Sequence, residues 1–404
     1  MSPAGRPRTR AAVFDLVRAA RRISRVDLAA RSGLTPATIT EVVRELLELE
    51  LVVEAGRGAS TGGKPPMLIE LNPEARYAVG VLYERNLCTV TVVDLTGRAM
   101  ATSSSPGTSL MPPEQALPVV AERIGRLLDE AGIERGRVLG AGLATYGPQD
   151  RRAGVVLTHQ PTADWFGHPV AGRLSELLGL PVLLDNDAVA AAIGEHWLGG
   201  VGSGTFGCLY MASGIGGGVV VDGEVYRGAS SNGVEVGHIT VDVDGGPCDC
   251  GNHGCLGNYA DPRAVIGQAM RVPGLDRRLG LDPADSDVIT SFVRIAAAAS
   301  GGDPEARTLI ERSARLLGTA AVTLTTLFDL ECIVLAGPAF GAATWIYQSV
   351  IQDELQRRAF VRRVHPVRVV PSVNGSDAAA IGAAALVLQS ELASLQLQEL
   401  YRAR

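Results

Sequence analysis

The sequence is poor in lysine, in aromatic residues and in long apolar runs. Lys64 is its single lysine, so arginine supplies 36 of the 37 basic residues. Aromatic residues make up 4% of the chain and glycine occurs 48 times, which favours closely packed α/β structure with many turns over a β-sandwich. No run of about 18 apolar residues occurs, so no membrane-spanning helix is expected. Asp15 and Arg18 interrupt the apolar stretch near the N-terminus, so we expect no secretory signal and a cytoplasmic location.

Cysteine and net charge are also low. Six cysteines in 404 residues do not make the disulfide framework of a secreted protein, and three of them fall within eight positions, which indicates a metal site. The net charge of -6 hides an asymmetry, because residues 1–65 carry 11 basic and 7 acidic side chains whereas the rest carries 26 and 36. The first 65 residues thus form a head with a net charge of +4, and the rest forms a body with a net charge of -10. A basic head on an acidic body favours nucleic-acid binding by the head.

Three helices are predicted at the N-terminus. Apolar spacing predicts the first over residues 9–21, Ser24 and Gly33 bound the second, and Thr35 caps a third that has Pro36 in its first turn. This is the helix-turn-helix pattern, although a plain three-helix bundle has the same periodicity. The inward stripe of the third helix is expected to be Ile39, Val42, Val43, Leu46 and Leu47. Its predicted DNA-contacting residues are Thr35, Ala37, Thr38, Thr40, Glu41 and Arg44.

A β-hairpin is predicted to follow these helices. Residues 51–54 and 67–71 have the pattern of strands, and the glycine-rich loop between them carries Arg57 and Lys64. Glycines let a backbone approach the duplex and the two cations can enter a minor groove, so the loop is interpreted as a DNA-binding wing. A flexible linker is the alternative, but linkers rarely lie inside a hairpin. The sequence therefore predicts a winged helix-turn-helix domain over residues 1–75.

Two motifs in the body carry chemistry. Asn186 and Asp187 follow a predicted strand and begin a predicted helix, where they can present an amide and a carboxylate to a polyol or simply cap the helix. The second motif supplies one imidazole and three thiolates, a complete ligand set for a closed zinc site. Its four ligands are predicted to be His238, Cys248, Cys250 and Cys255. His253 is a competing ligand, and reactive redox cysteines are the alternative reading.

Two weaker features complete the body. The glycine run between Ser213 and Val221 has the composition of a phosphate-cradling loop, but glycine-rich strand entries are common. Strand and helix signals alternate from residue 77 and recur from residue 207, which suits two actin-like halves with a cleft between them. Cys88, Cys208 and Cys332 lie in apolar, strand-like contexts and are expected in the core.

Taken together, the helix-turn-helix head, the wing phrase Ser60 to Pro65, the Asn-Asp pair and the His-Cys motif resemble the ROK family of repressors and kinases, through about residue 390. The resemblance implies an α/β chain whose body, residues 76–404, is two-lobed, actin-like or hexokinase-like (ribonuclease H-like), with the second lobe from about residue 205. It also implies one structural zinc ion per protomer. The residues that it implies for an effector sugar are Asn186, Asp187, Glu235 and His238.

The sequence departs from the family's kinases at several positions. Kinases open the body with Asp-x-Gly-Gly-Thr, whereas residues 82–86 here are Leu-Tyr-Glu-Arg-Asn. Gly257 stands where a sugar-binding glutamate is expected, Thr162 stands in the place of an asparagine, and Gly337-Pro338 replaces a Gly-Gly. We therefore predict that the chain is not an enzyme, has no catalytic residues, and keeps Asp187 as a vestigial base.

These observations predict a sequence-specific DNA-binding transcriptional regulator, a repressor of carbohydrate-metabolism genes, controlled by a sugar or sugar phosphate in the cleft. Its expected partners are double-stranded operator DNA, the effector and a second copy of itself, as a homodimer or a dimer of dimers, because two half-sites increase specificity. Two alternatives stay open. One is an active ATP-dependent sugar kinase with an accessory DNA-binding head, and the other is a regulator whose body senses no sugar and serves as a dimer or docking platform.

Overall fold

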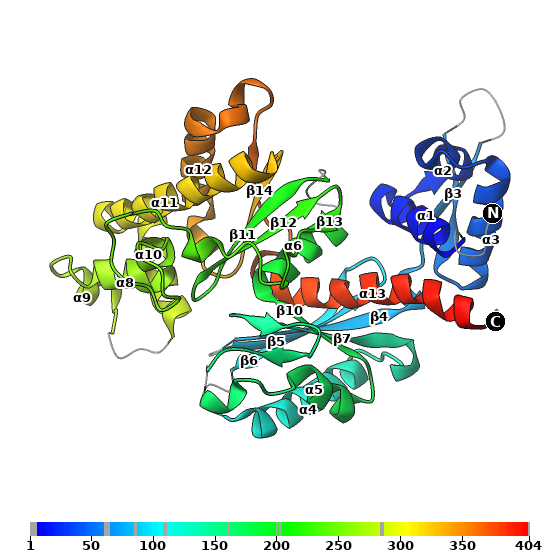
Figure 1. Cartoon of the computed structure of the whole chain (residues 1–404), viewed down its shortest axis with the longest axis horizontal. Helices are drawn as coiled ribbons and strands as arrows, with labels where there is room; N and C mark the ends of the chain where they lie inside the picture. The colour runs from blue at the N-terminus through cyan, green and yellow to red at the C-terminus, as the bar shows by residue number, and fades with distance from the viewer. Residues whose placement is uncertain are drawn as a thin grey trace.

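The computed structural model describes most of the chain, as a small N-terminal head on a larger body that contains two sheets (Figure 1). In the described part of the chain, no helix is both long enough and apolar enough to cross a membrane. The described residues are 6–59, 65–84, 87–107, 111–159, 162–198, 201, 204–282 and 287–402.

The head contains the three expected helices and a small sheet. Ser24 accepts a hydrogen bond from the Asp27 amide at the start of the second helix, and Gly33 ends that helix with a φ of 69°. Thr35 accepts from the Thr38 amide at the start of the third helix. The helix bounds are α1 Arg6–Ala20, α2 Arg25–Ser32 and α3 Pro36–Glu48. The sheet, in the order β1-β3-β2, consists of β1 Ile23–Ser24, β2 Val52–Arg57 and β3 Met67–Leu71.

The predicted apolar stripe of α3 forms the centre of the head. Ile39, Val42, Val43 and Leu46 are buried against α1 and the sheet, whereas Leu47 is half-buried at the edge of this core. The hairpin of β2 and β3 is antiparallel, with a bulge between Glu54 and Arg57. Because β1 adds Ile23 beside Ile69, the sheet has the third strand that a two-stranded hairpin needs for stability.

The first sheet of the body has the order β10-β7-β4-β5-β6. Helices α4 and α5 cover one face, and α13 covers the other (Figure 1). Gly80 and Gly142 make this second contact close, because a Cβ at either position would lie within 2 Å of a carbonyl oxygen of α13. The strands are β4 Tyr77–Tyr83, β5 Leu87–Asp94, β6 Ala99–Pro106, β7 Val138–Thr145 and β10 Val182–Asn186; the helices are α4 Pro113–Glu130, α5 Val170–Leu178 and α13 Ala378–Arg402.

The second sheet has the order β13-β12-β11-β14-β15. Along β11, Cys208 and Tyr210 pack with the alanines of α6, Asp187–Trp197, whereas Leu209 and Met211 pack with α11. Helices α6 and α13 therefore lie between the two sheets and form the centre of the body. The strands are β11 Phe206–Met211, β12 Ile215–Val221, β13 Glu224–Val225, β14 Cys332–Ala336 and β15 Arg368–Pro371.

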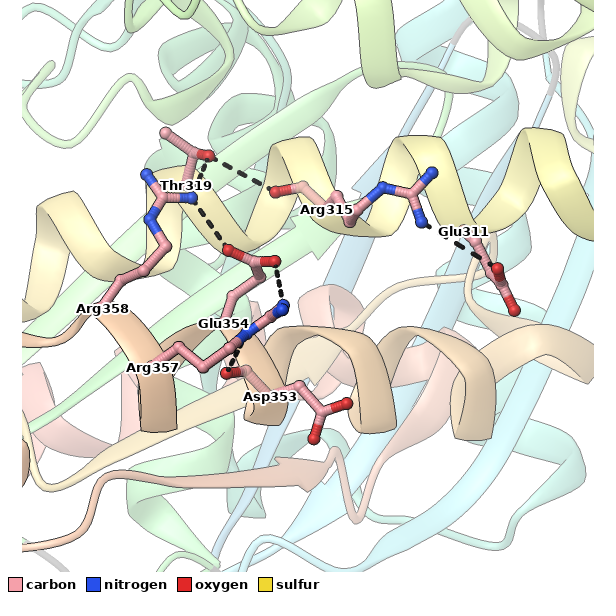
Figure 2. Close-up of polar contacts among 7 residues, drawn as sticks. All are labelled: Glu311, Arg315, Thr319, Asp353, Glu354, Arg357 and Arg358. Atoms are coloured by element: carbon pink, nitrogen blue, oxygen red, sulfur yellow. Dashed lines mark hydrogen bonds and ion pairs between the residues drawn. The ribbon is translucent and has the colours of Figure 1, made fainter.

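Helices cover the outer face of the second sheet. Glu354 of α12 is buried and accepts hydrogen bonds from Arg357 (2.5 Å) and Arg358 (2.9 Å), and Arg358 also donates to Thr319 of α11 (Figure 2). Gly318 lets the two helices approach, because a Cβ there would lie 2.7 Å from the Glu354 side chain. The helices are α7 Gly257–Ala260, α8 Pro262–Ala269, α9 Leu275–Leu279, α10 Val288–Ser300, α11 Pro304–Phe328 and α12 Thr344–Arg358.

Candidate functional site

The first candidate site lies where β10 ends and α6 begins. The Asn186 Oδ1 accepts hydrogen bonds from the amides of Ala188 (2.9 Å) and Val189 (3.2 Å), so this side chain does cap the helix, as the alternative reading allowed. The cap uses the amide oxygen, so the Nδ2 group of the same side chain can donate to a ligand. Capping and ligand binding are therefore compatible at Asn186.

Asp187 occupies the first position of α6 and is 8% exposed. Burial, together with the nearby carboxyls of Glu84 and Glu235, raises the pKa of its carboxyl to about 8. Its Oδ1 accepts one hydrogen bond from the Ala188 amide (2.8 Å), which does not offset these effects. The side chain is thus protonated at neutral pH, and it favours a ligand that hydrogen-bonds to the carboxyl or lowers its pKa.

The glycines of β12 bring a second segment close to Asp187. A Cβ at Gly216 would lie 2.7 Å from the Ala188 side chain on α6, and a Cβ at Gly217 would lie 2.2 Å from Val236 on the opposite face. β12 is therefore packed between α6 and the short 3-10 helix η4 Val236–His238. This arrangement explains the glycine run by close packing, and it gathers the predicted sugar-contacting residues around one strand.

Glu235 and His238 lie at the two ends of η4, and both are exposed to solvent. Glu235 is nevertheless surrounded by protein on most sides, and this desolvation raises its pKa, while the neighbouring His238 lowers it. The charge of Glu235 also acts on Asp187. The predicted sugar residues of the two sheets are thus near enough to interact electrostatically.

The predicted metal ligands converge at one point. One donor atom from each of His238, Cys248, Cys250 and Cys255 lies within 4.8 Å of the other three. The Cys250 and Cys255 sulfurs are 3.7 Å apart, and the Cys248 sulfur is 3.6 Å from the Nδ1 of His238. A tetrahedral zinc site requires sulfur–sulfur separations of ~3.8 Å and sulfur–nitrogen separations of ~3.5 Å, so these residues can hold a metal ion.

The competing ligand and the remaining cysteines lie elsewhere. His253 is exposed and contributes a backbone oxygen, which accepts a hydrogen bond from Thr240. Cys88, Cys208 and Cys332 are buried in strands, as expected.

Ion pairs and hydrogen bonds join the two halves of the body. Asp185 is 1% exposed and binds Arg227 (2.7 Å), from the segment after β13, and Arg151 (3.3 Å), from the first half. Asn232 exchanges two hydrogen bonds with the backbone of Gln149 (2.9 and 3.0 Å). Sequence reasoning did not find these residues, because no local pattern links positions that are 42 and 83 apart.

The turn after β4 carries a buried acid. Glu84 is 7% exposed, and burial raises its pKa to about 7. It lines a cavity of about 220 Å³ together with Ser213 and Pro338. Arg85 and Asn86 lie outside the described residues.

The predicted DNA-contacting residues lie along α3 and the hairpin. Ala37, Thr40 and Arg44 are exposed, and Thr38 and Glu41 are half-buried. Two hydroxyls are engaged locally, since the Thr35 Oγ1 caps α3 and the Thr40 Oγ1 donates to the Pro36 oxygen (2.8 Å). Arg57 is exposed at the end of β2, whereas Ser60 to Lys64, and thus the predicted contact of Lys64, lie outside the described residues.

Comparison with known proteins identifies the family. Residues 83–390 match the ROK family, which is more than half of the chain. The chain belongs to the ROK family. The xylose repressor of Caldicellulosiruptor bescii is 27% identical over 377 residues and covers 92% of this chain and 92% of its own. The DNA-binding transcriptional dual regulator NagC of Escherichia coli K12 is 28% identical over 396 residues, covering 96% and 94%.

Solved ROK structures agree with the fold. A ROK transcriptional regulator homologous to the E. coli MLC protein superposes with a TM-score of 0.75 at 24% identity and covers 98% of both chains, which confirms the expected fold class over the head and the body. A ROK glucokinase from Streptomyces griseus, solved with glucose and AMPPNP, has a TM-score of 0.66 at 29% identity. It covers 99% of its own chain but 78% of this one.

Proposed function

We propose that this ROK protein is a sequence-specific DNA-binding transcriptional regulator, a repressor of carbohydrate-metabolism genes that responds to a sugar or sugar phosphate. The observation that carries the proposal is a complete helix-turn-helix with a β-hairpin joined to a ROK body in one chain. Relatives named as repressors match 91% or more of this chain, whereas the glucokinase matches 78%. The additional part is about the length of the head, residues 1–75.

The exposed face of α3 supports a role in reading DNA. Thr35 and Pro36 start this helix with small residues, so its N-terminal end can enter a major groove, where Ala37, Thr38 and Arg44 can reach base edges. In this proposal Thr40 and Glu41 border the same groove, and Arg57 and Lys64 of the wing contact phosphates or the minor groove. Arg44 is paired with Glu48 at 3.3 Å between two exposed side chains, a weak contact that a base or phosphate can replace.

The four converging ligands support a structural zinc ion, one per protomer. Three thiolates and one imidazole at tetrahedral spacing, with no ligand position left over, are typical of a closed zinc site. The ion would tie the segment after η4 to the start of α7. Since the Nδ1 of His238 faces the sulfurs, its Nε2 is directed away from them and is the atom proposed to bind the sugar.

In the proposed effector site, Asn186 and Asp187 hold the sugar from α6, while Glu235 and His238 hold it from η4. A hydroxyl that donates to the Asp187 carboxylate stabilises the charged form, so binding should release a proton and strengthen as the pH rises toward 8. Gly257, where the family's kinases have a glutamate, removes one hydrogen bond and is expected to place affinity in the micromolar to millimolar range.

Phosphoryl transfer is not part of the proposal. It needs donors and a metal ion around the phosphates as well as a base. The cavity at this turn is lined by the carboxyls of Glu84 and Asp287 and by the single arginine Arg263. Two carboxyls beside one cation make a poor phosphate site, so Asp187 is proposed to be a ligand-binding residue and not a working base.

The proposed regulator acts in the cytoplasm as a dimer or a dimer of dimers, because two recognition helices on adjacent half-sites give the specificity that one α3 lacks. The test combines two measurements on the full chain. Selection of chromosomal fragments should enrich a site with two half-sites, and calorimetry with xylose, N-acetylglucosamine, glucose and their phosphates should find a ligand. If no fragment is enriched over bulk DNA, the proposal is wrong. Enrichment without any sugar binding would favour the docking-platform alternative.

A further inference from the structure

Helix α6 extends from the candidate effector site to the DNA-binding head. Its N-cap Asn186 and first residue Asp187 belong to the candidate effector site, and its last residue, Trp197, belongs to the same apolar cluster as Phe14 and Val17 of α1. At 1.5 Å per residue, the 11 residues of α6 span about 16 Å. One helix therefore has an end in each of the two places that a ligand-controlled regulator must connect.

Arg18 of α1 binds the C-terminal end of α6. Its Nη1 donates to the backbone oxygens of His196 (3.1 Å) and Trp197 (2.6 Å), and its guanidinium lies 4.8 Å from the centre of the Trp197 ring. The Arg18 side chain is 8% exposed. A helix leaves its last carbonyls without intrahelical partners and carries partial negative charge there, so a buried cation at this point is well placed.

His196 adds a further contact. Its Nε2 lies 3.4 Å from the Nη2 of Arg18. Burial and then the charge of Arg18 lower the pKa of His196 to about 4, so the ring is neutral and its Nε2 can accept a hydrogen bond from the guanidinium.

The space around Arg18 is loosely filled. A cavity of about 660 Å³ and another of about 630 Å³ lie between head and body, and Arg18 lines both. The first cavity reaches Arg98 and Asn374 of the body, and the second reaches Asp222 and Glu224. Head and body share the apolar cluster around Trp197, and the cavities beside it leave room for the head to change its tilt.

We infer that Arg18 is a positioning residue that couples the effector site to the DNA-binding head through α6. The inference rests on the proposed function for its biological meaning, but the contacts do not depend on it. A ligand that engages Asn186 or Asp187 acts on the first turn of α6, because Asn186 also caps that turn. Any shift of the helix moves the carbonyls that hold Arg18, and with them α1.

The packing of α6 favours its movement as a unit. Residues 187–195 are buried throughout, and Gly194 touches Gly382 of α13 so closely that a Cβ at Gly194 would lie 3.0 Å from it. Glu195, near the C-terminal end, accepts hydrogen bonds from Ser372 (2.5 Å) and Asn374 (2.9 Å) just before α13. Because α13 also lies against α1, a shift at the cleft reaches the head through neighbouring helices and not through a flexible linker.

Hydrogen exchange on the full chain tests this without any sugar or operator, so its failure would leave the proposed function untouched. The readout is amide exchange of residues 9–20 in α1. Arg18→Gln should speed this exchange about tenfold, equivalent to ~1.4 kcal/mol. Arg22→Gln is the matched control, since Arg22 pairs with Glu70 inside the head (2.6 Å) and should change α1 little.

The decisive comparison is a double-mutant cycle. Asn186→Ala removes the cap of α6 and should speed exchange in α1 about threefold when Arg18 is present, and not when residue 18 is glutamine. Exchange in β4 and β7 is followed in the same samples, and the effect on α1 is counted only where it exceeds the change in these two strands. An equal effect in both backgrounds, or none in the unaltered chain, would show that Arg18 merely attaches the head.

Discussion

Neutralising Asp187 should stabilise the ligand-free protein at alkaline pH, although it removes a proposed sugar contact. Burial, with Glu84 and Glu235 nearby, raises the pKa of this carboxyl from 3.8 to about 8. Between these two values the native state holds a proton that the unfolded chain has released. Stability therefore decreases as the pH rises through this window, and Asp187→Asn removes that decrease because an amide does not ionise.

The expected size follows from the shift. Each pH unit inside the window lowers the free energy of unfolding by about 1.4 kcal/mol, so the variant should gain ~4 kcal/mol on the unaltered chain between pH 5 and pH 8. Glu84 leaves a residual pH dependence in the variant, since burial raises its pKa to about 7. In thermal unfolding the difference should amount to several degrees.

Thermal unfolding between pH 5 and pH 9 measures this, with Asp185→Asn as the matched control. Asp185 lies two residues away and is also buried, but its charge is paired with Arg227 at 2.7 Å and Arg151 at 3.3 Å. Removing it leaves two arginines without their partner and should destabilise the chain by ~3–5 kcal/mol. The reasoning would be refuted if Asp187→Asn destabilised the protein at pH 8 as Asp185→Asn does.

Three further predictions concern the metal, the wing and the absent chemistry. Purified protein should contain one zinc ion per chain. Cys250→Ser should release this ion, whereas the control variant His253→Gln should retain it. Zinc loss in both variants would contradict the proposed ligand set. Arg57→Ala should weaken binding to all DNA sequences and reduce the slope of log affinity against log salt concentration by about one. Thr38→Ala should instead change which DNA sequences are preferred. Unchanged binding of the Arg57→Ala variant at every salt concentration would exclude the wing contact. No sugar should be phosphorylated by ATP, and turnover that disappears in Asp187→Asn would overturn our interpretation of Glu84.

The local features of the head could be predicted because each depends on a few neighbouring residues. Ser24, Gly33 and Thr35 bound helices through contacts that span at most four positions. The metal ligands were also accessible, since Cys248, Cys250 and Cys255 lie within eight positions and His238 lies 10 residues earlier.

The contacts that unite the molecule could not be predicted. Arg18 was considered only as a charge that interrupts an apolar stretch, yet its partners His196 and Trp197 lie 178 and 179 residues away. From the sequence, the glycines of β12 fit a phosphate loop or an ordinary strand entry, and their close contact with α6 depends on how the two sheets meet. Such pairings follow from topology, and a single sequence carries no periodic signal for them.

Asn186 shows why a structural and a functional interpretation of one residue need not compete. From the sequence, capping and sugar binding were alternatives for this side chain. In the structure the cap uses Oδ1 alone, and the donor group remains available to a ligand. A ligand that engages the side chain of a helix cap acts on the whole helix that this residue starts. The helix that begins after Asn186 is α6, and the backbone oxygen of its last residue, Trp197, accepts a hydrogen bond from Arg18. A position that is well explained by local structure can therefore also be the point at which a ligand controls distant parts of the protein.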